Sequence, residues 1–361
     1  MDLMAHKSQE RGKGGCMKFQ STLIFAALLA MGFLESSAAA ATEPHARYWH
    51  AFSGNGNEVA GTSRLFLFGG DGGSPDYKQL NDLWYYRADT RQWTLAPTGR
   101  TKPSPRHGVG WSCGGGQCVA ASGGYAGAFK ETWIYTESTA AWSQLNCKRY
   151  TCPPARWYSS MAYDPSRLQH VLFGGEQWSN VLLNDTYTLA GGRWTARSPA
   201  SKPPPREAAA AAFARGPVNM VVLYGGAYLK TVNNMRYYAA RCDMWAWNGS
   251  TWQSISLSGE GPCLEMPSMV WSPGSDDLIV SGGYTLVDGG ERPNREVWHF
   301  KFNTATSGTW SKDTGSLAYC ASTASPGAVM AYDVPTGAKV FFGGFQNFPQ
   351  TVAVGNTTFC D

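Results

Sequence analysis

One short pattern recurs six times along the chain. Apolar and aromatic residues run into a pair of glycines, and the first glycines of successive pairs are separated by 54, 51, 51, 57 and 61 residues. The copies are LFLFGGDG at 65–72, VAASGGYA at 119–126, HVLFGGEQ at 170–177, VVLYGGAY at 221–228, LIVSGGYT at 278–285 and KVFFGGFQ at 339–346. A short apolar run that ends in glycine is typical of a buried strand. Repetition at this period indicates units that must stack on one another to bury their apolar faces.

Each glycine pair lies within a fixed order of signals. An arginine that often follows proline stands 17, 18 or 19 residues before the first glycine at Arg106, Arg156 and Arg206, and Arg47 precedes the first copy. An aromatic strand follows each pair, at 81–86, 130–135, 184–189, 242–247 and 295–300. A further strand then carries one tryptophan per repeat: Trp93, Trp142, Trp194, Trp252 and Trp310. Four short strands joined by turns predict an antiparallel meander, and meanders repeated around an axis form a β-propeller.

Composition agrees with an all-β fold. Aromatic residues make up 13% of the chain and charged residues only 16%, which suits many short buried strands better than helices with solvated faces. We therefore predict a single all-β domain over residues 42–361, a six-bladed propeller of four-stranded antiparallel blades. The sixth repeat lacks both tryptophans, so its blade is either short or completed by a strand from the N-terminal region of the domain.

Residues 1–41 have the features of a leader. Lys18 precedes an apolar run over residues 22–34, and small residues follow it around Ala40. The run is too short to span a bilayer comfortably, so we expect a cleaved signal peptide, with a retained anchor as the alternative. The mature chain is then secreted or periplasmic and has no membrane span.

Charge and histidine placement exclude several classes of partner. The net charge is +4, and the longest basic run is two residues, which disfavours a nucleic-acid partner. The six histidines are scattered, so we expect no metal or other cofactor. A copper radical oxidase, which needs two histidines around one metal, is disfavoured for the same reason.

Eight of the nine cysteines follow the leader, and an even number after a secretory leader favours disulfides. Cys113 and Cys118 flank a glycine-rich turn, where a hairpin would bring them together. Cys147 and Cys152 lie across a short loop. Metal binding by these pairs is the alternative.

Three sequons, at Asn184, Asn248 and Asn356, could carry glycans if the source is eukaryotic. Asn184 lies in the repeated Asn-Asp motif, which favours a structural role for it.

The order of lead arginine, Gly-Gly, Asn-Asp-Leu-Trp-Tyr-Tyr and tryptophan resembles the kelch repeat over residues 47–354. In this comparison Cys263 and Cys320 occupy the position of the lead arginine in the fifth and sixth repeats. The resemblance implies that the loop before the first strand and the loop after the second emerge on one face, which favours a bond between Cys242 and Cys263. Cys320 with Cys360 follows by elimination, and the pairing of these four cysteines stays open.

Kelch-like propellers commonly bind ligands through that loop face, at the mouth of the channel. The resemblance therefore gives the ligand-binding candidates Asp71, Arg106, His107, Tyr125, Arg156, Trp157, Glu176, Arg206, Glu207, Tyr228 and Tyr284, with Arg47, Trp49 and Phe345 at related positions. An arginine that recurs once per repeat usually supports the loop. The residues that differ between repeats, such as Asp71 and Trp157, are more informative.

Two functions fit this mixture of aromatic and charged residues. The first is a binding module for a protein or a glycan, which needs no catalytic group. The second is a sugar-modifying enzyme, because the chain is similar to periplasmic sialic acid mutarotases in length, leader and six kelch units. That chemistry would use Glu176 or Glu207 as general acid or base, with Arg156 or Arg206 facing the sugar. The sequence does not predict an oligomeric state.

Overall fold

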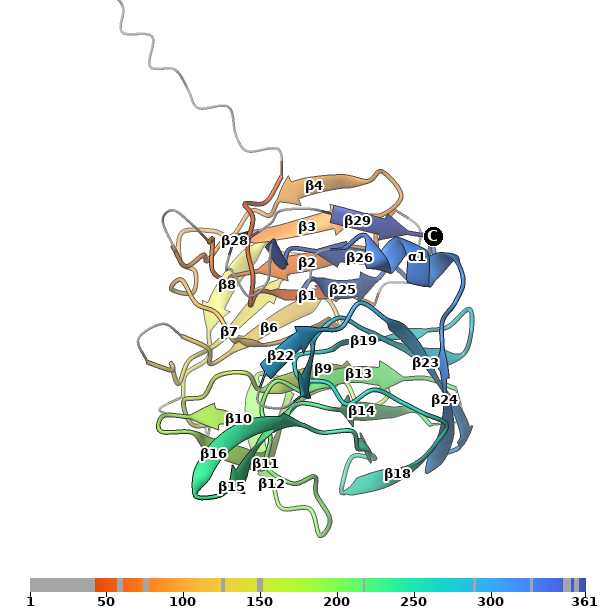
Figure 1. Ribbon diagram of the computed structural model, residues 1–361. Coiled ribbons are helices and arrows are strands. Elements are labelled where there is room, and N and C mark those ends of the chain that lie inside the picture. The colour runs from red at the N-terminus through yellow and green to blue at the C-terminus, as the bar shows by residue number, and fades with distance from the viewer. Residues whose placement is uncertain are drawn as a thin grey trace, which may run out of the picture. The chain divides into compact units, whose positions relative to one another are not determined.

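The computed structural model describes residues 43–56, 61–73, 78–124, 127–147, 152–216, 218–287, 290–324, 327–346, 352–353 and 357–361. These residues belong to one compact unit, Ala41–Asp361 (Figure 1). The expected leader, Tyr125 and Asn356 lie outside the described residues.

The first three repeats form three separate four-stranded antiparallel sheets in chain order. The first contains β1 (Ala51–Gly54), β2 (Leu65–Phe68), β3 (Leu83–Arg87) and β4 (Gln92–Leu95). The second contains β5 (Gly110–Gly114), β6 (Gln117–Ala121), β7 (Thr132–Thr136) and β8 (Ala141–Gln144). The third contains β9 (Ser160–Asp164), β10 (Gln169–Gln177), β11 (Val181–Ala190) and β12 (Arg193–Arg197). This is the predicted meander.

The fourth and fifth repeats form meanders that merge into one eight-stranded sheet. The fourth contributes β13 (Ala210–Ala214), β14 (Met220–Tyr224), β17 (Met244–Trp247) and β18 (Trp252–Ser258). The fifth contributes β19 (Ser268–Ser272), β20 (Asp277–Ser281), β23 (Val297–Thr304) and β24 (Ser307–Lys312). Their outermost strands, β18 and β24, pair in parallel over Ser256–Ser258 and Ser307–Thr309, a join that the repeat pattern does not predict.

The last repeat forms a three-stranded sheet of β25 (Val329–Tyr332), β26 (Lys339–Phe342) and β29 (Thr357–Cys360), and β27 (Phe345–Gln346) pairs with β28 (Val352–Ala353) in a separate short hairpin. The outer strand of this sheet is therefore the C-terminal segment, and the only β-pairing made by residues 43–50 is the isolated bridge between Tyr48 and Asp71. A short helix, α1 (Ser316–Ser322), lies against β29 and β23. In the part of the chain that the structure describes, no helix has the length and apolar character needed to cross a bilayer. The all-β, propeller-like fold is confirmed.

Contacts between neighbouring sheets run around the whole unit. The innermost strands β1, β5, β9, β13, β19 and β25 contact one another in chain order, and β25 contacts β1. The Gly70 amide donates to the Arg106 carbonyl oxygen at 2.9 Å, and the Gly344 amide donates in the same way to Arg47 at 3.0 Å. The second bond joins the end of the chain to its beginning.

The same contacts explain the glycine pairs. Gly69 and Gly70 have φ angles of 65° and 96°, in the left-handed region that favours glycine. A Cβ atom on Gly69 would lie 2.6 Å from the Arg106 carbonyl oxygen, and one on Gly70 would lie 2.7 Å from that of Tyr48. The pair therefore lets the end of the second strand touch a loop of its own sheet and a loop of the next sheet.

Aromatic side chains fill the space between sheets. Phe66 and Phe68 of the first sheet pack with Trp111 and Trp142 of the second. Trp194 and Trp252 are buried in the same manner farther along the chain. Each such ring removes a large apolar surface from water, which is the packing role expected of the repeated tryptophans.

The sulfur atoms of four cysteine pairs lie at bonding distance: Cys113–Cys118, Cys147–Cys152, Cys242–Cys263 and Cys320–Cys360. This arrangement is compatible with the expected disulfides and gives a pairing for the four cysteines left open above.

The expected alignment of the fifth and sixth repeats is wrong. The Gly226 amide donates to the carbonyl oxygen of Leu264, so Leu264 rather than Cys263 stands where the lead arginine stands elsewhere. Cys320 lies in α1 and not in a lead loop. Cys263 lies one residue before the lead position, where its sulfur atom meets that of Cys242.

Candidate functional site at the mouth of the channel

The mouth, where the innermost strands begin, is bounded by a chain of backbone hydrogen bonds. Gly108 donates to Trp49, Tyr158 to Gly108, Ala208 to Tyr158 and Met266 to Ala208, at 2.8–3.3 Å. All five residues have φ between 51° and 58°. A non-glycine residue in this conformation costs about 1 kcal/mol or more and persists only where its surroundings hold it. We call these five residues the mouth ring; they line a cavity of about 170 Å³.

The lead arginines lie beside the mouth but are fully buried. The two Nη atoms of Arg156 donate to the Asp185 carboxylate at 2.6 and 2.8 Å, and Nη1 also donates to the Gly174 carbonyl oxygen at 2.9 Å. Arg47 and Arg206 make the same bonds, to Asp82 and Asp243, and Arg106 bonds Glu131 at 2.7 Å. These arginines therefore anchor loops and have no free guanidinium to offer a ligand.

The lead arginines lower the pKa values of two of the carboxylates that they bind. Although burial opposes ionisation, hydrogen bonds from Arg206 hold the pKa of Asp243 below its ordinary value. Arg47 does the same for the pKa of Asp82. The pairs remain ionised at neutral pH, as a buried arginine requires.

In four repeats the residue after the lead position bridges the residue after the glycine pair, and in the second repeat His107 bridges Gly124, the second glycine of its pair. The bridges are Tyr48–Asp71, His107–Gly124, Trp157–Glu176, Glu207–Ala227 and Glu265–Tyr284. They bring the predicted candidates Asp71, His107, Trp157, Glu176, Glu207 and Tyr284 around the mouth. Tyr228 lies farther out, on β15 (Ala227–Val232), with the Arg241 guanidinium 4.3 Å from its ring centroid.

Four carboxylates gather here, from Asp71, Glu176, Glu207 and Glu265; we call them the acid cluster. Burial first, and then the charges of all four, raise the pKa of the Tyr158 phenol that lies among them. Burial and a hydrogen bond with Glu176 raise the pKa of Glu207 to about 9. Burial and the charge of Glu291 raise the pKa of Glu265 to about 7. The cluster therefore retains protons at neutral pH.

A second polar group joins the acid cluster on the side of the first two sheets. His107 Nδ1 lies 3.1 Å from Asp71 Oδ2 and 2.7 Å from Gln79 Nε2. The His107 ring also contacts the rings of Trp49 and Tyr158, with centroids 5.1 and 6.2 Å away. Aromatic faces and acceptor oxygens are thus interleaved across the mouth.

Two hairpins extend outward from the glycine pairs on this face. One joins β10 to β11 and the other joins β15 to β16 (Met235–Ala240). A cavity of about 450 Å³ lies at the foot of the first, lined by His107, Trp157, Tyr158 and Glu176 together with residues 177–180. The rings of Trp157 and Trp178 lie 6.0 Å apart at its edge.

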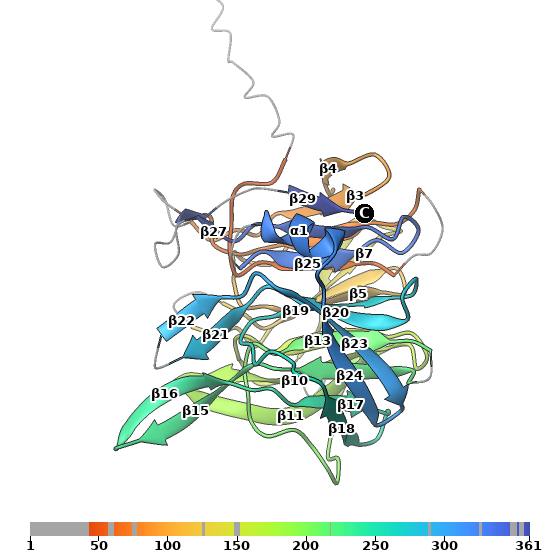
Figure 2. The same ribbon diagram turned by 45° about the vertical axis from the view of Figure 1, so that its right-hand side comes forward.

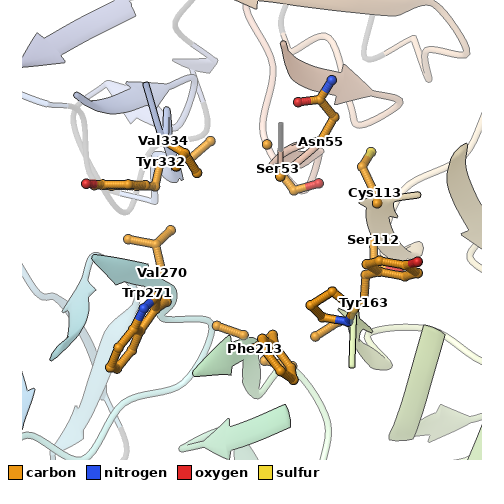
Figure 3. A pocket seen from close by; sticks show the side chains of 18 of the residues that line it. Ser53, Asn55, Ser112, Cys113, Tyr163, Phe213, Val270, Trp271, Tyr332 and Val334 are labelled. Carbon is orange, nitrogen blue, oxygen red and sulfur yellow. The ribbon is translucent and has the colours of Figure 1, made fainter. Parts of the chain in front are cut away.

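A larger cavity, of about 590 Å³, lies at the opposite end of the channel (Figure 3). Its walls come from the ends of the innermost strands and include Tyr163, Phe213, Trp271 and Tyr332. The resemblance did not indicate this end.

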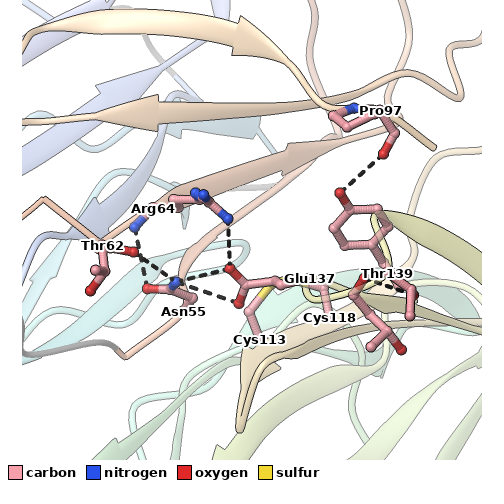
Figure 4. Close-up of polar contacts among 10 residues, drawn as sticks. Asn55, Thr62, Arg64, Pro97, Cys113, Cys118, Glu137 and Thr139 are labelled. Carbon is pink, nitrogen blue, oxygen red and sulfur yellow. Dashed lines mark hydrogen bonds and ion pairs between the residues drawn. A yellow bond between two sulfur atoms is a disulfide. The ribbon is translucent and has the colours of Figure 1, made fainter.

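One charged pair lies beside the larger cavity (Figure 4). Arg64 Nη1 donates to Glu137 Oε2 at 3.2 Å, and Asn55 Nδ2 donates to the same carboxylate at 3.3 Å. The mouth instead holds buried carboxylate oxygens of Asp71, Glu207 and Glu265 that have no hydrogen-bond partner, which makes it the stronger candidate for a binding site. Among the described residues, no three His, Cys, Asp or Glu side chains are placed to hold a metal ion.

Comparison with protein families agrees with this geometry. The profile described as the KLHDC2/KLHL20/DRC7 Kelch-repeats domain matches residues 32–226, more than half of the chain. The chain belongs to the kelch-repeat family. Kelch propellers typically bind proteins, so the fold suggests a protein-binding module. A comparison with curated proteins gave no match.

Sequence analysis of this kelch propeller missed several residues of the mouth. Glu265 was missed because the fifth repeat was aligned on Cys263; a shift of one residue would have placed Leu264 with the lead arginines and Glu265 with Glu207. Tyr158 follows Trp157 by one residue, and its importance depends on the left-handed turn. Tyr238, whose hydroxyl donates to Glu176 Oε1 at 3.2 Å, comes from a hairpin outside the repeat pattern.

Proposed function

We propose that this kelch propeller is a protein-binding module that acts outside the cytoplasm, secreted or periplasmic, and binds its partner through the mouth and the adjacent hairpins. We also propose that the ring has six blades, the last of them three-stranded. The leader pattern and the four cysteine pairs at bonding distance support the location. The contacts of the innermost strands support the blade number.

The observation that carries the proposal is the exposure of large apolar side chains on the hairpins. On the first hairpin, Trp178 is 71% exposed and Val181 is 49% exposed. On the second, Met235 is 57% exposed, and Val232 and Tyr237 are exposed as well. Exposed aromatic and methionine side chains grouped beside a cavity are typical of protein interfaces.

A third hairpin, formed by β21 (Tyr284–Val287) and β22 (Gly290–Pro293), extends this surface. β16 contacts β21, and the β15–β16 and β21–β22 hairpins project from the same side of the protein in Figure 2. A surface of this kind suits a protein partner better than a small ligand, which would be enclosed in a cavity.

Photocrosslinking from the hairpins tests the proposal. A photoreactive amino acid replacing Gln177 should capture a protein from the extracellular or periplasmic fraction of the native source. Adding Trp178→Ala and Met235→Ala should reduce capture at least tenfold, because anchor side chains dominate interface energetics. Tyr319→Ala is the control, since Tyr319 is 77% exposed on α1, away from the mouth. Capture that survives the hairpin variants, or binding on a glycan array without any captured protein, would contradict the proposal.

A sugar-modifying activity is the second candidate. The observation that favours it is the Glu176–Glu207 pair, in which a carboxyl group with a raised pKa lies beside a second carboxylate. Arg156 and Arg206, which the sequence suggested would face the sugar, instead form ion pairs with Asp185 and Asp243. Exchange between the anomers of reducing sugars, measured by NMR, should accelerate on adding the protein and should not with Glu207→Gln. Equal exchange rates with and without the protein would reject this candidate.

A further inference from the structure

We propose that the mouth recognises a positively charged side chain of the partner protein, a lysine ammonium or an arginine guanidinium, held between the acid cluster and the surrounding aromatic rings. This inference rests on the proposed protein-binding function and specifies the chemistry of the bound segment.

Unpartnered buried oxygens are the first argument. Glu207 is 5% exposed and Asp71 and Glu265 are each 8% exposed, yet Oε2 of both glutamates and Oδ1 of Asp71 have no hydrogen-bond partner. The Gln79 side-chain oxygen is in the same state. Leaving a buried oxygen unpaired destabilises the protein, and an ionised carboxylate or an amide oxygen can only accept, so a ligand that satisfies these atoms must donate hydrogen bonds.

The position of these oxygens is the second argument. Glu207 bonds Glu176, and Glu176 lines the 450 Å³ cavity at the foot of the first hairpin. Asp71 bonds His107, which lines the same cavity. The four carboxylates all act on Tyr158, which lines both this cavity and that of the mouth ring. A cation bound beside Tyr158 would therefore lie within the electrostatic field of the whole cluster.

The sign of the charge is the third argument. The nearby lead arginines are paired with their own carboxylates, so they do not neutralise the cluster. A carboxylate or phosphate ligand would be repelled by like charges. An ammonium or guanidinium would gain charge-assisted hydrogen bonds, which are stronger than those between neutral groups.

The aromatic walls complete the site. Trp49, Trp157, Tyr158 and Trp178 line the two cavities on the mouth and hairpin side, and Glu176 of the acid cluster lines the second of them. Their faces attract a cation and also pack against the aliphatic stem of a lysine or arginine side chain. Both parts of such a side chain therefore find a complementary surface.

Protonation gives this recognition a distinctive signature. Glu207 faces Glu176 of β10, Tyr238 of β16 and the Glu265 carboxylate, and Glu265 faces Glu291 of β22. A bound cation favours the ionised carboxylates, so binding releases protons. Because the pKa of Glu265 is about 7 and that of Glu207 about 9, affinity should rise as the pH increases from 6 to 9.

Four acetylated and amidated peptides test the proposal by calorimetry at constant ionic strength: (Gly-Arg)4, (Gly-Lys)4, (Gly-Glu)4 and (Gly-citrulline)4. Citrulline matches arginine in shape but is neutral. The full chain should bind the arginine or lysine peptide, with affinity at least tenfold higher at pH 9 than at pH 6 for arginine. The glutamate and citrulline peptides should bind at least tenfold more weakly.

Variants locate the effect. Glu265→Gln should remove the rise around pH 7 and Glu207→Gln the rise toward pH 9, since each keeps its size but no longer ionises. Asp276→Asn, which removes an exposed charge from the β19–β20 turn at the far end, should bind as the wild type does. Equal binding of the citrulline and arginine peptides by the wild type would overturn the inference, even if a variant fails to fold.

The proposed function can survive this failure. If the crosslinked partner depends on Trp178 and Met235 but is not displaced by the arginine or lysine peptide, the mouth face binds protein and the inference about charge is wrong. Capture that persists in the Trp178→Ala and Met235→Ala variant would instead reject the protein-binding proposal itself.

Discussion

At the scale of single residues, the repeated Asp-x-Trp segment explains why the lead arginine is needed. Trp84 donates its indole N–H to Asp82, and Trp245 donates to Asp243, on carboxylates that also bind the lead arginines. In the fifth repeat, where Leu264 replaces the arginine, Glu296 accepts a hydrogen bond from Trp298 and pairs with Lys312 instead. The acidic residue of the fifth repeat thus keeps a cationic partner, Lys312, even though this repeat has no lead arginine.

Removing the charge of a carboxylate that binds a lead arginine should strongly destabilise the fold. Asp185→Asn leaves the fully buried Arg156 without its counter-charge, and we expect a loss of about 3 kcal/mol in the free energy of unfolding. Urea denaturation at pH 7 measures the change. Asp276→Asn, an exposed control, should stay within about 0.5 kcal/mol of the wild type. Similar values for the two variants would show that the buried pair contributes little.

A comparison of two glycines separates backbone strain from close approach. Gly191 has φ 54° and open space around its Cα, whereas a Cβ on Gly69 would lie against the next sheet. Gly191→Ala should cost about 1 kcal/mol from the left-handed backbone alone. Gly69→Ala should cost at least twice as much, because the Arg106 loop must also move. Equal costs in denaturant unfolding would mean that the inter-sheet contact is compliant.

At the scale of elements, loops and hairpins rather than strands carry the features that differ between repeats. The fifth repeat has a charged link of its own on β23, where His299 Nδ1 lies 2.7 Å from Asp277 Oδ2 and Nε2 lies 2.9 Å from Asp313 Oδ2. The link joins β20, β23 and the segment after β24. The hydrogen bonds that His299 donates to the carboxylates of Asp277 and Asp313 outweigh burial and raise the pKa of His299.

This raised pKa makes a prediction for stability against pH. The protonated His299 stabilises the folded state below its ordinary pKa of about 6.5, and this contribution is lost as the pH rises through the higher folded value. His299→Gln should therefore cost about 1.5 kcal/mol at pH 5.5 and progressively less at higher pH. Denaturation of both proteins across pH 5.5–9 measures the difference. A difference that does not fall with pH would contradict the assignment.

At the scale of the whole molecule, the last sheet closes on the first by side-chain packing. Phe52 and Trp84 of the first sheet pack with Val340 and Phe342 of the last. The Trp93 indole also donates to the Thr357 hydroxyl at 2.9 Å. Among the described residues, neither of these two sheets contains a strand from the other repeat. The contact between them therefore depends on the position of the C-terminal strand β29.

A Cys320–Cys360 disulfide would hold that strand in place and should contribute more to stability than a disulfide between residues close in the chain. It closes a separation of 40 residues, against 5 for Cys113–Cys118. Chain-entropy reasoning then gives losses of about 4 and about 2 kcal/mol for the two double Cys→Ser variants. Thermal and denaturant unfolding under non-reducing conditions compares them. A smaller loss for the 320/360 variant would show that packing alone holds the ring closed.

The sequence determined the all-β meander, the glycine pairs and the kelch family, because these depend on local propensity and on signals that recur in every repeat. It also placed Glu176 and Glu207 on the mouth face, since their offsets from the repeated arginine and glycines are constant.

The tertiary structure decided the features that break the repeat. The Leu264 register, the parallel pairing of β18 with β24 and the arrival of Tyr238 beside Glu176 depend on contacts between segments far apart in the chain. The burial that leaves carboxylate oxygens unpartnered arises only when several sheets converge on one axis, and no periodic pattern along a single chain records that convergence.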